Sequence, residues 1–345
     1  MEAIRYLFIK VSKLIHEYLC FILRFQGFLA KFGLAFSNKY MIELNIKNET
    51  DKLEAVVLGV ANSPGPVPSI EEAYDPKSKQ FIENGQYPTE ADTIAEIEAF
   101  AKALEKHGVK VYRPKVLQDV NQIFSRDISF VIDDKIVVAN VLEEREEEVE
   151  AIQNIMKDIN PVHILEMPDG MRAEGGDVMP WNGKLFVGYS EPEDFKKYKV
   201  SRTNRRGVDF LKENFPNYEV HAFELVKSDD DPKANALHLD CCFQPIGKNQ
   251  AILFPGGFKN QSDVAFLRNY FGVENIIEIT RDEMYYMFSN VFSISPEVIV
   301  SEKNFTRLNT ELRKRGFTVE EVPYAEISKQ EGLLRCSTMP LRRTK

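Results

Sequence analysis

Cys336 is the residue whose type and position most directly suggest chemistry. It lies near the C-terminus in EGLLRCSTMPLRRTK, in a polar segment, between Arg335 and two hydroxyl residues. A cysteine that serves only in packing behaves as a small apolar residue, whereas a reactive one lies among polar or cationic neighbours. The position is therefore either accidental or that of a nucleophile. A nucleophile needs a base and groups that hold a substrate, and other parts of the chain must supply them.

Four polar residues open strand-like segments at a nearly regular spacing. Each is followed by an apolar run, a polar turn and a second apolar run, which is the pattern of a β-hairpin. The strongest of the turn signals is Asn182-Gly183. The openings lie about 50 to 63 residues apart, and Cys336 follows at a similar interval. A period near 50 residues is typical of a repeat architecture. The four residues are Asp127, Asp177, Asp240 and Asn290.

Each hairpin is followed by a helix-like stretch and a short β-like run, so the chain reads as repeated units of two strands, a helix and a strand. The helical stretches are expected at 142–159, 204–215, 262–272 and 304–316, with a less regular first copy at 89–108. Such units bury a shared core by packing side by side. Five units arranged in a ring would bring the hairpin openings to a central channel.

Acidic residues at the openings predict a site for a cationic ligand, because carboxylates are seldom fully buried without a partner. The alternative is that these Asp and Asn residues only cap the turns before the strands, a role that both residue types favour.

Four short motifs follow one another in a set order. They are FSRD (124–127), EGGD (174–177), HLD (238–240) and LRCSTMPL (334–341), with RTN (202–204) between the second and third. From about residue 53 to the C-terminus this ordered set resembles the guanidino-group-modifying superfamily, which includes arginine deiminases, dimethylarginine dimethylaminohydrolases and amidinotransferases. The resemblance implies an α/β fold, a five-bladed α/β propeller (pentein) with pseudo-fivefold ββαβ repeats, which agrees with the rhythm of the hairpins.

The resemblance also implies catalytic roles for three residues. Cys336 matches the nucleophile that attacks the central guanidino carbon and forms a covalent S-alkyl thiouronium intermediate. His238 matches the acid/base that protonates the leaving amine and later deprotonates water. Glu174 matches the carboxylate that orients this histidine.

Four further residues are expected to bind the substrate. Asp127 and Asp240 match the carboxylates that grip the planar cation through its N–H edges. Asp177 is also expected to bind the substrate. The alternatives for Asp177 are a structural role and a contact at the rim of the site. Arg202 matches an arginine that binds the substrate's α-carboxylate, with the start of a helix as its alternative role. The expected partner is therefore a small guanidino molecule of the amino-acid type, such as arginine, a methylated arginine or citrulline. No metal or other cofactor is implied.

The sequence is compatible with more than one type of reaction. A hydrolase of the arginine deiminase or dimethylarginine dimethylaminohydrolase kind and an amidinotransferase share every step up to the thiouronium. They differ in whether water or an amine then attacks it. A protein of another class, a non-catalytic propeller that binds a cationic ligand, is a third hypothesis. A cysteine protease is disfavoured because it gives no reason for the several carboxylates.

Composition limits the partners. The formal net charge of −9 disfavours nucleic acid as the main ligand, because proteins that bind phosphate backbones present positive faces. The four cysteines form no CxxC pair and no zinc spacing, which favours a reducing compartment, and we expect a cytoplasmic protein. A homo-oligomer is left open.

Residues 1–40 differ in character from the rest. Their apolar residues recur at helical spacing, but basic residues interrupt them too often for a membrane span of about 20 apolar residues. An amphipathic extension is expected, either interfacial at a membrane or not part of the native chain, since Met41 begins an ordinary-looking domain. Residues 41–345 are expected to form a single catalytic domain.

Overall fold

Five small β-sheets of three strands each form the framework of the protein. The structure is a computed structural model that describes residues 40–345, so the amphipathic extension expected at residues 1–40 lies outside the described residues except for its last position. In sheet order the strands are β15 (Thr338–Thr344), β1 (Lys52–Leu58) and β2 (Lys110–Tyr112); β3 (Ser129–Ile132), β4 (Lys135–Val138) and β5 (Ile164–Glu166); β6 (Val178–Trp181), β7 (Lys184–Tyr189) and β8 (Glu219–Glu224); β9 (Phe243–Ile246), β10 (Gln250–Leu253) and β11 (Ile276–Glu278); and β12 (Phe292–Ser293), β13 (Val298–Glu302) and β14 (Thr318–Val322).

The same unit recurs in each sheet. Two strands pair antiparallel, as β6 and β7 do with Trp181 opposite Lys184, and a third strand pairs parallel to the second, as β8 does with β7. The tight turn between β6 and β7 contains Asn182 and Gly183 with φ of 47° and 77°, the positive values that a two-residue hairpin turn of this kind requires. The predicted ββαβ rhythm is therefore observed in five sheets.

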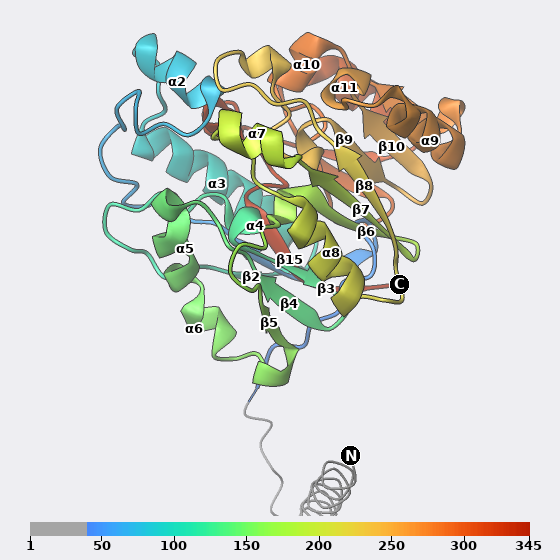
Figure 1. Ribbon diagram of the computed structural model, residues 1–345, viewed down its shortest axis with the longest axis horizontal. Coiled ribbons are helices and arrows are strands. Elements are labelled where there is room, and N and C mark those ends of the chain that lie inside the picture. The colour runs from blue at the N-terminus through green and yellow to red at the C-terminus, as the bar shows by residue number, and fades with distance from the viewer. Residues whose placement is uncertain (1–39) are drawn as a thin grey trace, which may run out of the picture. The chain divides into compact units, whose positions relative to one another are not determined.

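Helices provide the crossover connection that a parallel strand pair needs. They lie to the sides of the strands in Figure 1, with α2, α3 and α5 on one side and α9, α10 and α11 on another. Their bounds are α2 (Pro76–Glu83), α3 (Glu90–Lys106), α4 (Ser125–Ile128), α5 (Glu146–Ala151), α6 (Gln153–Met156), α7 (Pro192–Lys197), α8 (Arg205–Asn214), α9 (Gln261–Phe271), α10 (Arg281–Tyr285) and α11 (Thr306–Lys314).

The longest helix, α3, shows why these segments become helical and how they pack. The Thr89 side chain accepts a hydrogen bond from Asp92 N and caps the helix, and acidic residues occupy its first turn, where they interact favourably with the helix dipole. Its buried residues recur at the spacing of one helical face and include Ile97, Phe100 and Leu104. This apolar face packs against β2 and β14, so one helix joins two neighbouring sheets.

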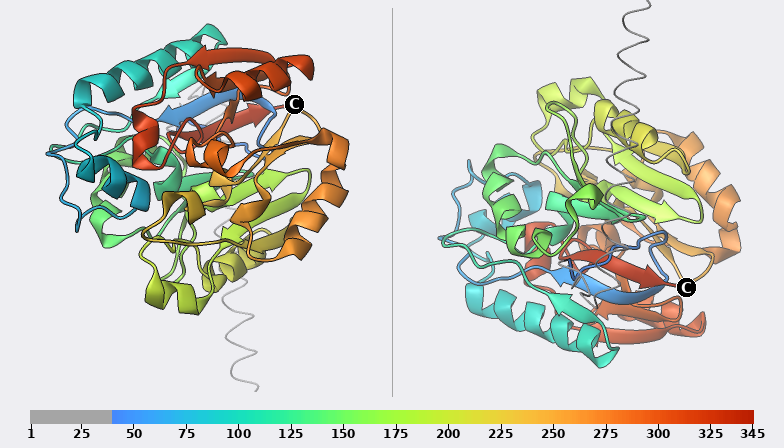
Figure 2. Two further views of the ribbon diagram at one scale, coloured as in Figure 1. Left: turned by 90° about the horizontal axis from the view of Figure 1, so that it is seen from above. Right: turned by 90° about the horizontal axis from the view of Figure 1, so that it is seen from below.

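The two ends of the described chain meet in one sheet. The final strand β15 pairs antiparallel with β1, from Lys52 opposite Thr344 to Leu58 opposite Thr338. Both views of Figure 2 show the blue strand β1 beside the red strand β15. Residues from Ile42 to Lys345 form one compact unit. Within the described residues no helix combines the length and apolar character that crossing a membrane requires.

The hairpin openings have a common local structure, and this structure positions the site. Asp127 lies in the short helix α4, Asp177 in a 3-10 turn (Gly175–Asp177) and Asp240 in another 3-10 turn (Leu239–Cys241), each just before the first strand of its hairpin. Asn290 precedes β12 in the same way. All four side chains are buried.

Candidate active site

Cys336 lies in the turn before β15, and its sulfur contacts two of the hairpin openings. Asn290 Nδ2 donates a hydrogen bond to Sγ at 3.1 Å, and the thiol faces Asp240 Oδ2 at 3.6 Å. Asn290 Oδ1 also accepts hydrogen bonds from the backbone N–H groups of Arg335 and Cys336. The Cys336 side chain is only 2% exposed. The cysteine is therefore held in a defined position by residues about 50 and 100 positions away in the sequence.

His238 is positioned between two carboxylates. Its Nε2 is 2.8 Å from Glu174 Oε2, and its Nδ1 is 3.7 Å from Asp127 Oδ1. Burial disfavours the imidazolium, but Asp127 and the hydrogen bond to Glu174 outweigh burial and raise the pKa of His238 to about 8. The imidazole thus has the histidine–carboxylate arrangement expected from the EGGD and HLD motifs, and it favours the protonated form at neutral pH.

Asp127 also pairs with a residue that sequence reasoning missed. Arg145 Nη1 donates to Asp127 Oδ2 at 2.8 Å, and its Nε and Nη2 form a bidentate pair with Glu148. Arg145 lies in the acidic stretch LEEREEEVEA, where it resembles an ordinary charge on a solvated helix. The only signal in the sequence is that it follows the FSRD motif within one repeat unit. The other oxygen of Asp127, Oδ1, is buried and has no hydrogen-bond partner among the described residues.

Asp240 is held from behind by a buried charge network. Arg335 Nη1 donates to Asp240 Oδ2 at 2.9 Å, and its Nε and Nη2 pair with the two carboxylate oxygens of Glu49 at 3.1 Å. The same guanidinium also donates to the carbonyls of Gly175, Gly176 and Val178. Glu49 is a second residue that the motifs did not indicate, because it precedes the first strand and has no motif around it.

Arg202 and Asp177 lie in different surroundings. Arg202 is fully buried, lies 3.5 Å from Glu174 and stacks over the Tyr74 ring at 5.3 Å. Asp177 is also buried, but its Oδ1 accepts the backbone N–H of Leu239 at 2.8 Å. Asp177 therefore fixes the turn that carries Asp240, and it does not line the pocket described below. Of its two alternative roles, the structural one fits this position.

One pocket collects most of the expected residues. Cys336, His238, Asp127 and Arg202 line it together with Arg145, and its volume is about 10 Å³, which is room for about one water molecule. We call this space the inner pocket. Glu174 and Asp240 are not among its lining residues but contact those that are, namely His238 and Cys336.

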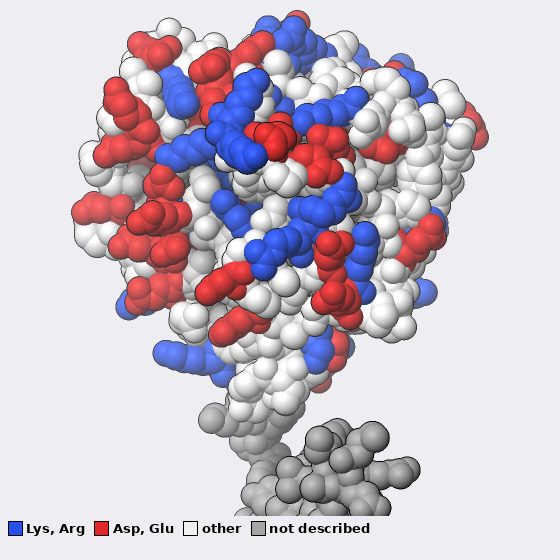
Figure 3. Space-filling model, viewed as in Figure 1, with Lys and Arg blue, Asp and Glu red and all other residues white. Residues whose placement is uncertain are grey.

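A much larger outer cleft of about 650 Å³ adjoins the inner pocket. Tyr74, Asp75, Phe124 and Gln330 line both spaces, so the two adjoin along these residues. The cleft is lined by no lysine or arginine among the described residues, and Figure 3 shows acidic side chains gathering on the side of α2 and α5. Its acidic lining residues are Glu72, Asp75, Glu90, Asp119, Glu144, Glu147 and Glu148.

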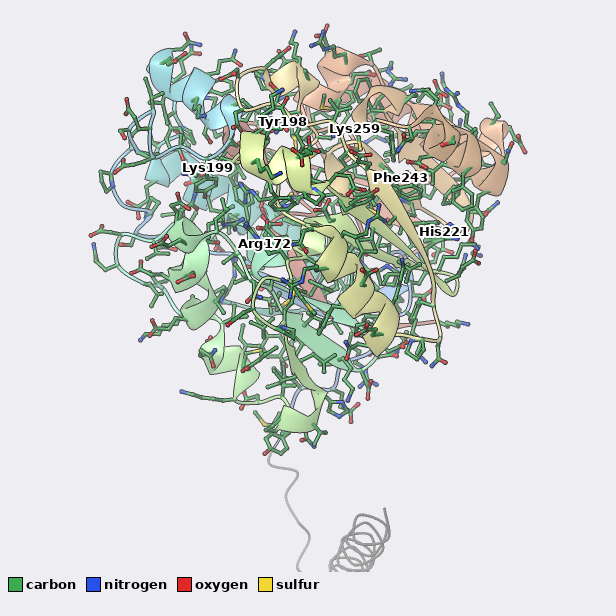
Figure 4. The ribbon with its side chains drawn as sticks, in the orientation of Figure 1. Arg172, Tyr198, Lys199, His221, Phe243 and Lys259 are labelled. Atoms are coloured by element: carbon green, nitrogen blue, oxygen red, sulfur yellow. The ribbon has the colours of Figure 1, made fainter. Side chains whose placement is uncertain are left out.

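Basic groups lie beside the cleft but outside its lining. Lys199, labelled next to α7 in Figure 4, forms an ion pair with Glu144. Arg172, labelled in the same view, lies over the Phe195 ring at 5.6 Å. The cleft itself therefore presents carboxylates, which favour a cationic ligand.

The charges around Cys336 oppose ionisation of its thiol. Burial and the nearby Asp240 and Asp127 carboxylates raise the pKa of Cys336 well above its ordinary value.

Asp127, Glu174 and His238 place ligand atoms within 4.8 Å of one another. This cluster has the donor types of a metal site, but Arg145 and Arg202 already lie against its two carboxylates.

The comparison with protein families assigns the chain to a family. The model of the family described as N,N dimethylarginine dimethylhydrolase, eukaryotic, matches residues 71–343, well over half of the chain. The chain belongs to this family, and with it to the guanidino-group-modifying pentein superfamily. Glu49 lies outside the matched residues.

Individual proteins are similar to the chain over half or more of its length. The uncharacterized protein YkgA of Bacillus subtilis is 29% identical over 243 residues, which cover 70% of this chain and 77% of that protein. An arginine deiminase of Latilactobacillus sakei is 29% identical over 211 residues, 50% of this chain and 48% of the deiminase. The chain therefore spans about half of that enzyme.

Solved structures share the fold. SxtG, an amidinotransferase from Microseira wollei, superposes with a TM-score of 0.70 and 20% identity, covering 88% of this chain and 98% of SxtG. The N-terminal domain of ArgZ, a cyanobacterial arginine dihydrolase, has a TM-score of 0.68 and 17% identity, covering 85% and 98%. At these identities the likeness concerns the fold alone.

Proposed function

We propose that the protein is a cysteine-dependent hydrolase that acts on the guanidino group of arginine or a related amino acid. The observation that carries the proposal is the convergence of Cys336, His238, Asp127 and Arg202 on one pocket. Asp127 Oδ1 has no hydrogen-bond partner among the described residues and is available to the N–H edge of a planar cation. Membership of the dimethylarginine dimethylhydrolase family supports the same substrate class.

In the proposed first half-reaction the bound guanidinium brings a positive charge beside Cys336. This charge favours the thiolate, which the free protein disfavours, and because His238 is already protonated the thiol proton passes to solvent. The sulfur attacks the central carbon, and the tetrahedral adduct loses ammonia or a methylated amine after that nitrogen takes a proton from the His238 imidazolium. An S-alkyl thiouronium remains on Cys336. Glu174 keeps the imidazole oriented toward the reacting atoms.

In the second half-reaction the neutral His238 takes a proton from a water molecule, which attacks the thiouronium carbon. The C–S bond breaks, the hydroxyl proton of the adduct passes to the sulfur and restores the thiol, and a ureido group leaves with the amino-acid part of the substrate. Asp127 and Asp240 accept hydrogen bonds from the N–H groups on the reacting carbon through these steps, and Arg202 holds the α-carboxylate. Asp177 contributes by fixing the turn that carries Asp240.

A second candidate function is amidino transfer, and the fold shared with SxtG favours considering it. The two candidates differ in the intermediate. A hydrolase expels the small amine and keeps the amino-acid part on the cysteine, whereas a transferase expels ornithine and keeps only the amidino carbon with its two nitrogens.

Product analysis tests the proposal. The full chain is incubated with arginine or N,N-dimethylarginine, with and without glycine, and quenched in acid. We expect citrulline with ammonia or dimethylamine, and a mass increase on the Cys336 peptide that includes the amino-acid part. Cys336→Ser should lose both the adduct and at least about 10⁴-fold of kcat. Ornithine with guanidinoacetate would identify the transferase, and undiminished turnover by Cys336→Ser would refute the nucleophile.

A further inference from the structure

Asn290 is the one hairpin opening without a role in the proposed reaction. The openings Asp127, Asp177 and Asp240 are acids, whereas Asn290, which precedes β12, is a neutral amide. Its side chain is completely buried. A buried amide is expected to use both its acceptor oxygen and its donor nitrogen, so the groups that these two atoms contact indicate what the residue does.

The backbone around Cys336 fixes the orientation of this amide. Asn290 Oδ1 accepts hydrogen bonds from the N–H groups of Arg335 at 2.9 Å and of Cys336 at 3.2 Å. Two donors on one side of an amide require an oxygen there, so the Nδ2 group must occupy the other side. That side faces the sulfur, and Nδ2 donates to Cys336 Sγ at 3.1 Å.

The segment that carries Asn290 is held firmly beside the site. The Ser289 hydroxyl donates to the backbone carbonyl of Asp240 at 2.8 Å. Three residues before Asn290, Met287 is buried with a φ of 68°, and its carbonyl accepts the Asn290 N–H at 2.9 Å. A positive φ is unfavourable for methionine and persists only where the surrounding structure holds it. The amide is therefore fixed relative to the turn that carries Asp240.

The surroundings of the sulfur give this donor its importance. Asp240 Oδ2 lies 3.6 Å from Sγ, and burial together with Asp240 and Asp127 raises the pKa of the Cys336 thiol, whereas the backbone of Leu333 and the side chain of Asn290 act in the opposite direction. Among the described residues, Asn290 is the only side chain that donates a hydrogen bond to Sγ. A fourth carboxylate at this opening would oppose the thiolate further, and the amide supplies a hydrogen in its place.

We propose that Asn290 is a further catalytic residue, which stabilises negative charge on the Cys336 sulfur by donating a hydrogen bond from Nδ2. The inference rests on the proposed function, because the charge develops in the cysteine-dependent reaction. When the thiol loses its proton to solvent, the N–H group donates to a thiolate and the hydrogen bond strengthens. The same donor contacts the sulfur when the C–S bond breaks and its electron pair returns to Sγ, before the sulfur takes up its proton.

Asn290→Asp tests the donor with little change of shape. The aspartate keeps an oxygen for the N–H groups of Arg335 and Cys336 but has a second oxygen where the N–H donor was. Below the thiol pKa, the rate at which 2-chloroacetamide alkylates Cys336 follows the fraction of thiolate. Measured from the mass of the Cys336 peptide, this rate should fall about 10-fold or more, because a hydrogen bond to a charged group is lost. The kcat for arginine should fall about 10²-fold, while KM stays within about 3-fold.

Two further variants separate this role from a general effect on folding. Asn290→Ala removes the donor without adding a carboxyl group, which in its protonated form can itself donate to sulfur, and it should also slow alkylation. Asn309→Asp makes the same chemical change at another buried asparagine of the same repeat unit, in α11, whose Nδ2 donates to the carbonyl of Glu302. Asn309 lines neither pocket, so this control should lose stability to urea and keep its alkylation rate and kcat within about 2-fold.

Unchanged alkylation of folded Asn290→Asp and Asn290→Ala would overturn the proposal, even with a lower kcat, because the residue would then only position Cys336. If these variants do not fold, the wild-type chain decides. In protein labelled with nitrogen-15 asparagine, one side-chain amide proton should move downfield as Cys336 ionises on raising the pH, and this movement should be absent from Cys336→Ser. No such movement would also overturn the proposal.

The measurements distinguish this inference from the proposed function. Slower alkylation of Asn290→Asp in a protein that turns over no guanidino compound would retain Asn290 as the thiolate donor and reject the hydrolase. Turnover of arginine that is unaffected by both substitutions at Asn290 would retain the hydrolase and reject the donor.

Discussion

At the scale of single residues, the site is governed by the opposed ionisation of a thiol and an imidazole. Asp127 and Glu174 stabilise the His238 imidazolium, while Asp240, Asp127 and burial disfavour the Cys336 thiolate. In the free protein the pair therefore carries one proton more than the proposed reaction needs. A bound guanidinium can change this balance because it brings a positive charge next to the sulfur.

This arrangement predicts the pH dependence of kcat/KM. In the proposed reaction the free protein must lose one proton from the thiol–imidazolium pair, and His238, with its pKa raised to about 8, loses it first. The rate constant for arginine should therefore rise as the pH increases through about 8. Initial rates at low substrate concentration between pH 6 and 9 measure this rise, which is the acidic limb of the pH profile of kcat/KM.

Replacing Glu174 tests the cause of that limb. Glu174→Gln removes the negative charge that stabilises the imidazolium, so the rising limb should move to lower pH by on the order of one unit, and kcat should fall about 10²-fold. Glu191→Gln, which alters a partly exposed carboxylate paired with Arg205, should leave the limb in place. A limb that does not move with Glu174→Gln would show that this carboxylate does not act through His238.

At the scale of elements, the two glycines of the turn before β6 let residues of the candidate site approach closely. A Cβ on Gly176 would lie 2.6 Å from His238 Cγ and Nδ1, and one on Gly175 would lie 2.2 Å from the carbonyl of Arg126. The two glycines of EGGD are therefore needed for space and not for an unusual φ. The motif joins a carboxylate that contacts His238 to a backbone on which the same imidazole packs.

Gly176→Ala is accordingly expected to damage the site more than the fold. The added methyl group must displace the imidazole, which should reduce kcat/KM about 10²-fold or more and cost about 1–3 kcal/mol of unfolding free energy. Gly183→Ala is the matched control from the same hairpin: its φ of 77° makes alanine unfavourable, but no atom lies within 4 Å of the new Cβ. It should cost about 1 kcal/mol and leave kcat/KM unchanged. Kinetics and denaturant unfolding are measured for both variants. A fully active Gly176→Ala would contradict the expected loss of kcat/KM.

At the scale of the whole molecule, buried charges hold distant parts of the chain together around the site. Arg335 joins Glu49 from the first described residues, Asp240 from the fourth sheet and the carbonyls of the Gly175–Val178 turn from the third. Its own burial is complete. An arginine in this position is stable only because several acceptors share its five N–H groups.

Glu49 is the partner whose removal best tests this network. Burial raises its pKa, but Arg335 and Arg126 outweigh burial and lower the pKa of Glu49 from 4.5 to about 2. A lowered pKa stabilises the fold above the unfolded value, and this contribution of about 3 kcal/mol is lost as the pH falls from about 4.5 to 2. Glu49→Gln should therefore reduce the unfolding free energy by about 3 kcal/mol at pH 7, and the difference from wild type should narrow on acidification.

Glu43→Gln is the control for Glu49, because Glu43 is an exposed carboxylate of the same segment that pairs with Arg342. Its effect should stay below about 1 kcal/mol at every pH. Urea unfolding at pH 7, 4 and 3 measures both variants. A difference between wild type and Glu49→Gln that is small, or that does not change with pH, would argue against a structural role for the Glu49–Arg335 pair.

Much of this organisation was determined by the sequence alone. Hairpins and turns depend on neighbouring residues, so the fivefold rhythm, the Asn182-Gly183 turn and the openings at Asp127, Asp177, Asp240 and Asn290 could be predicted. The ordered motifs then pointed to Cys336, His238 and Glu174 as a group, and to the superfamily that the family comparison bears out.

Only the tertiary structure decided which charges meet. Glu49 has no spacing or motif that separates it from an ordinary surface charge, Arg145 has only its place after FSRD, and Asp177 looks like the other hairpin openings although it fixes a turn. Local sequence does not encode such roles because a buried charge is stabilised by partners from distant units. Those partners become neighbours only when the five sheets have packed together.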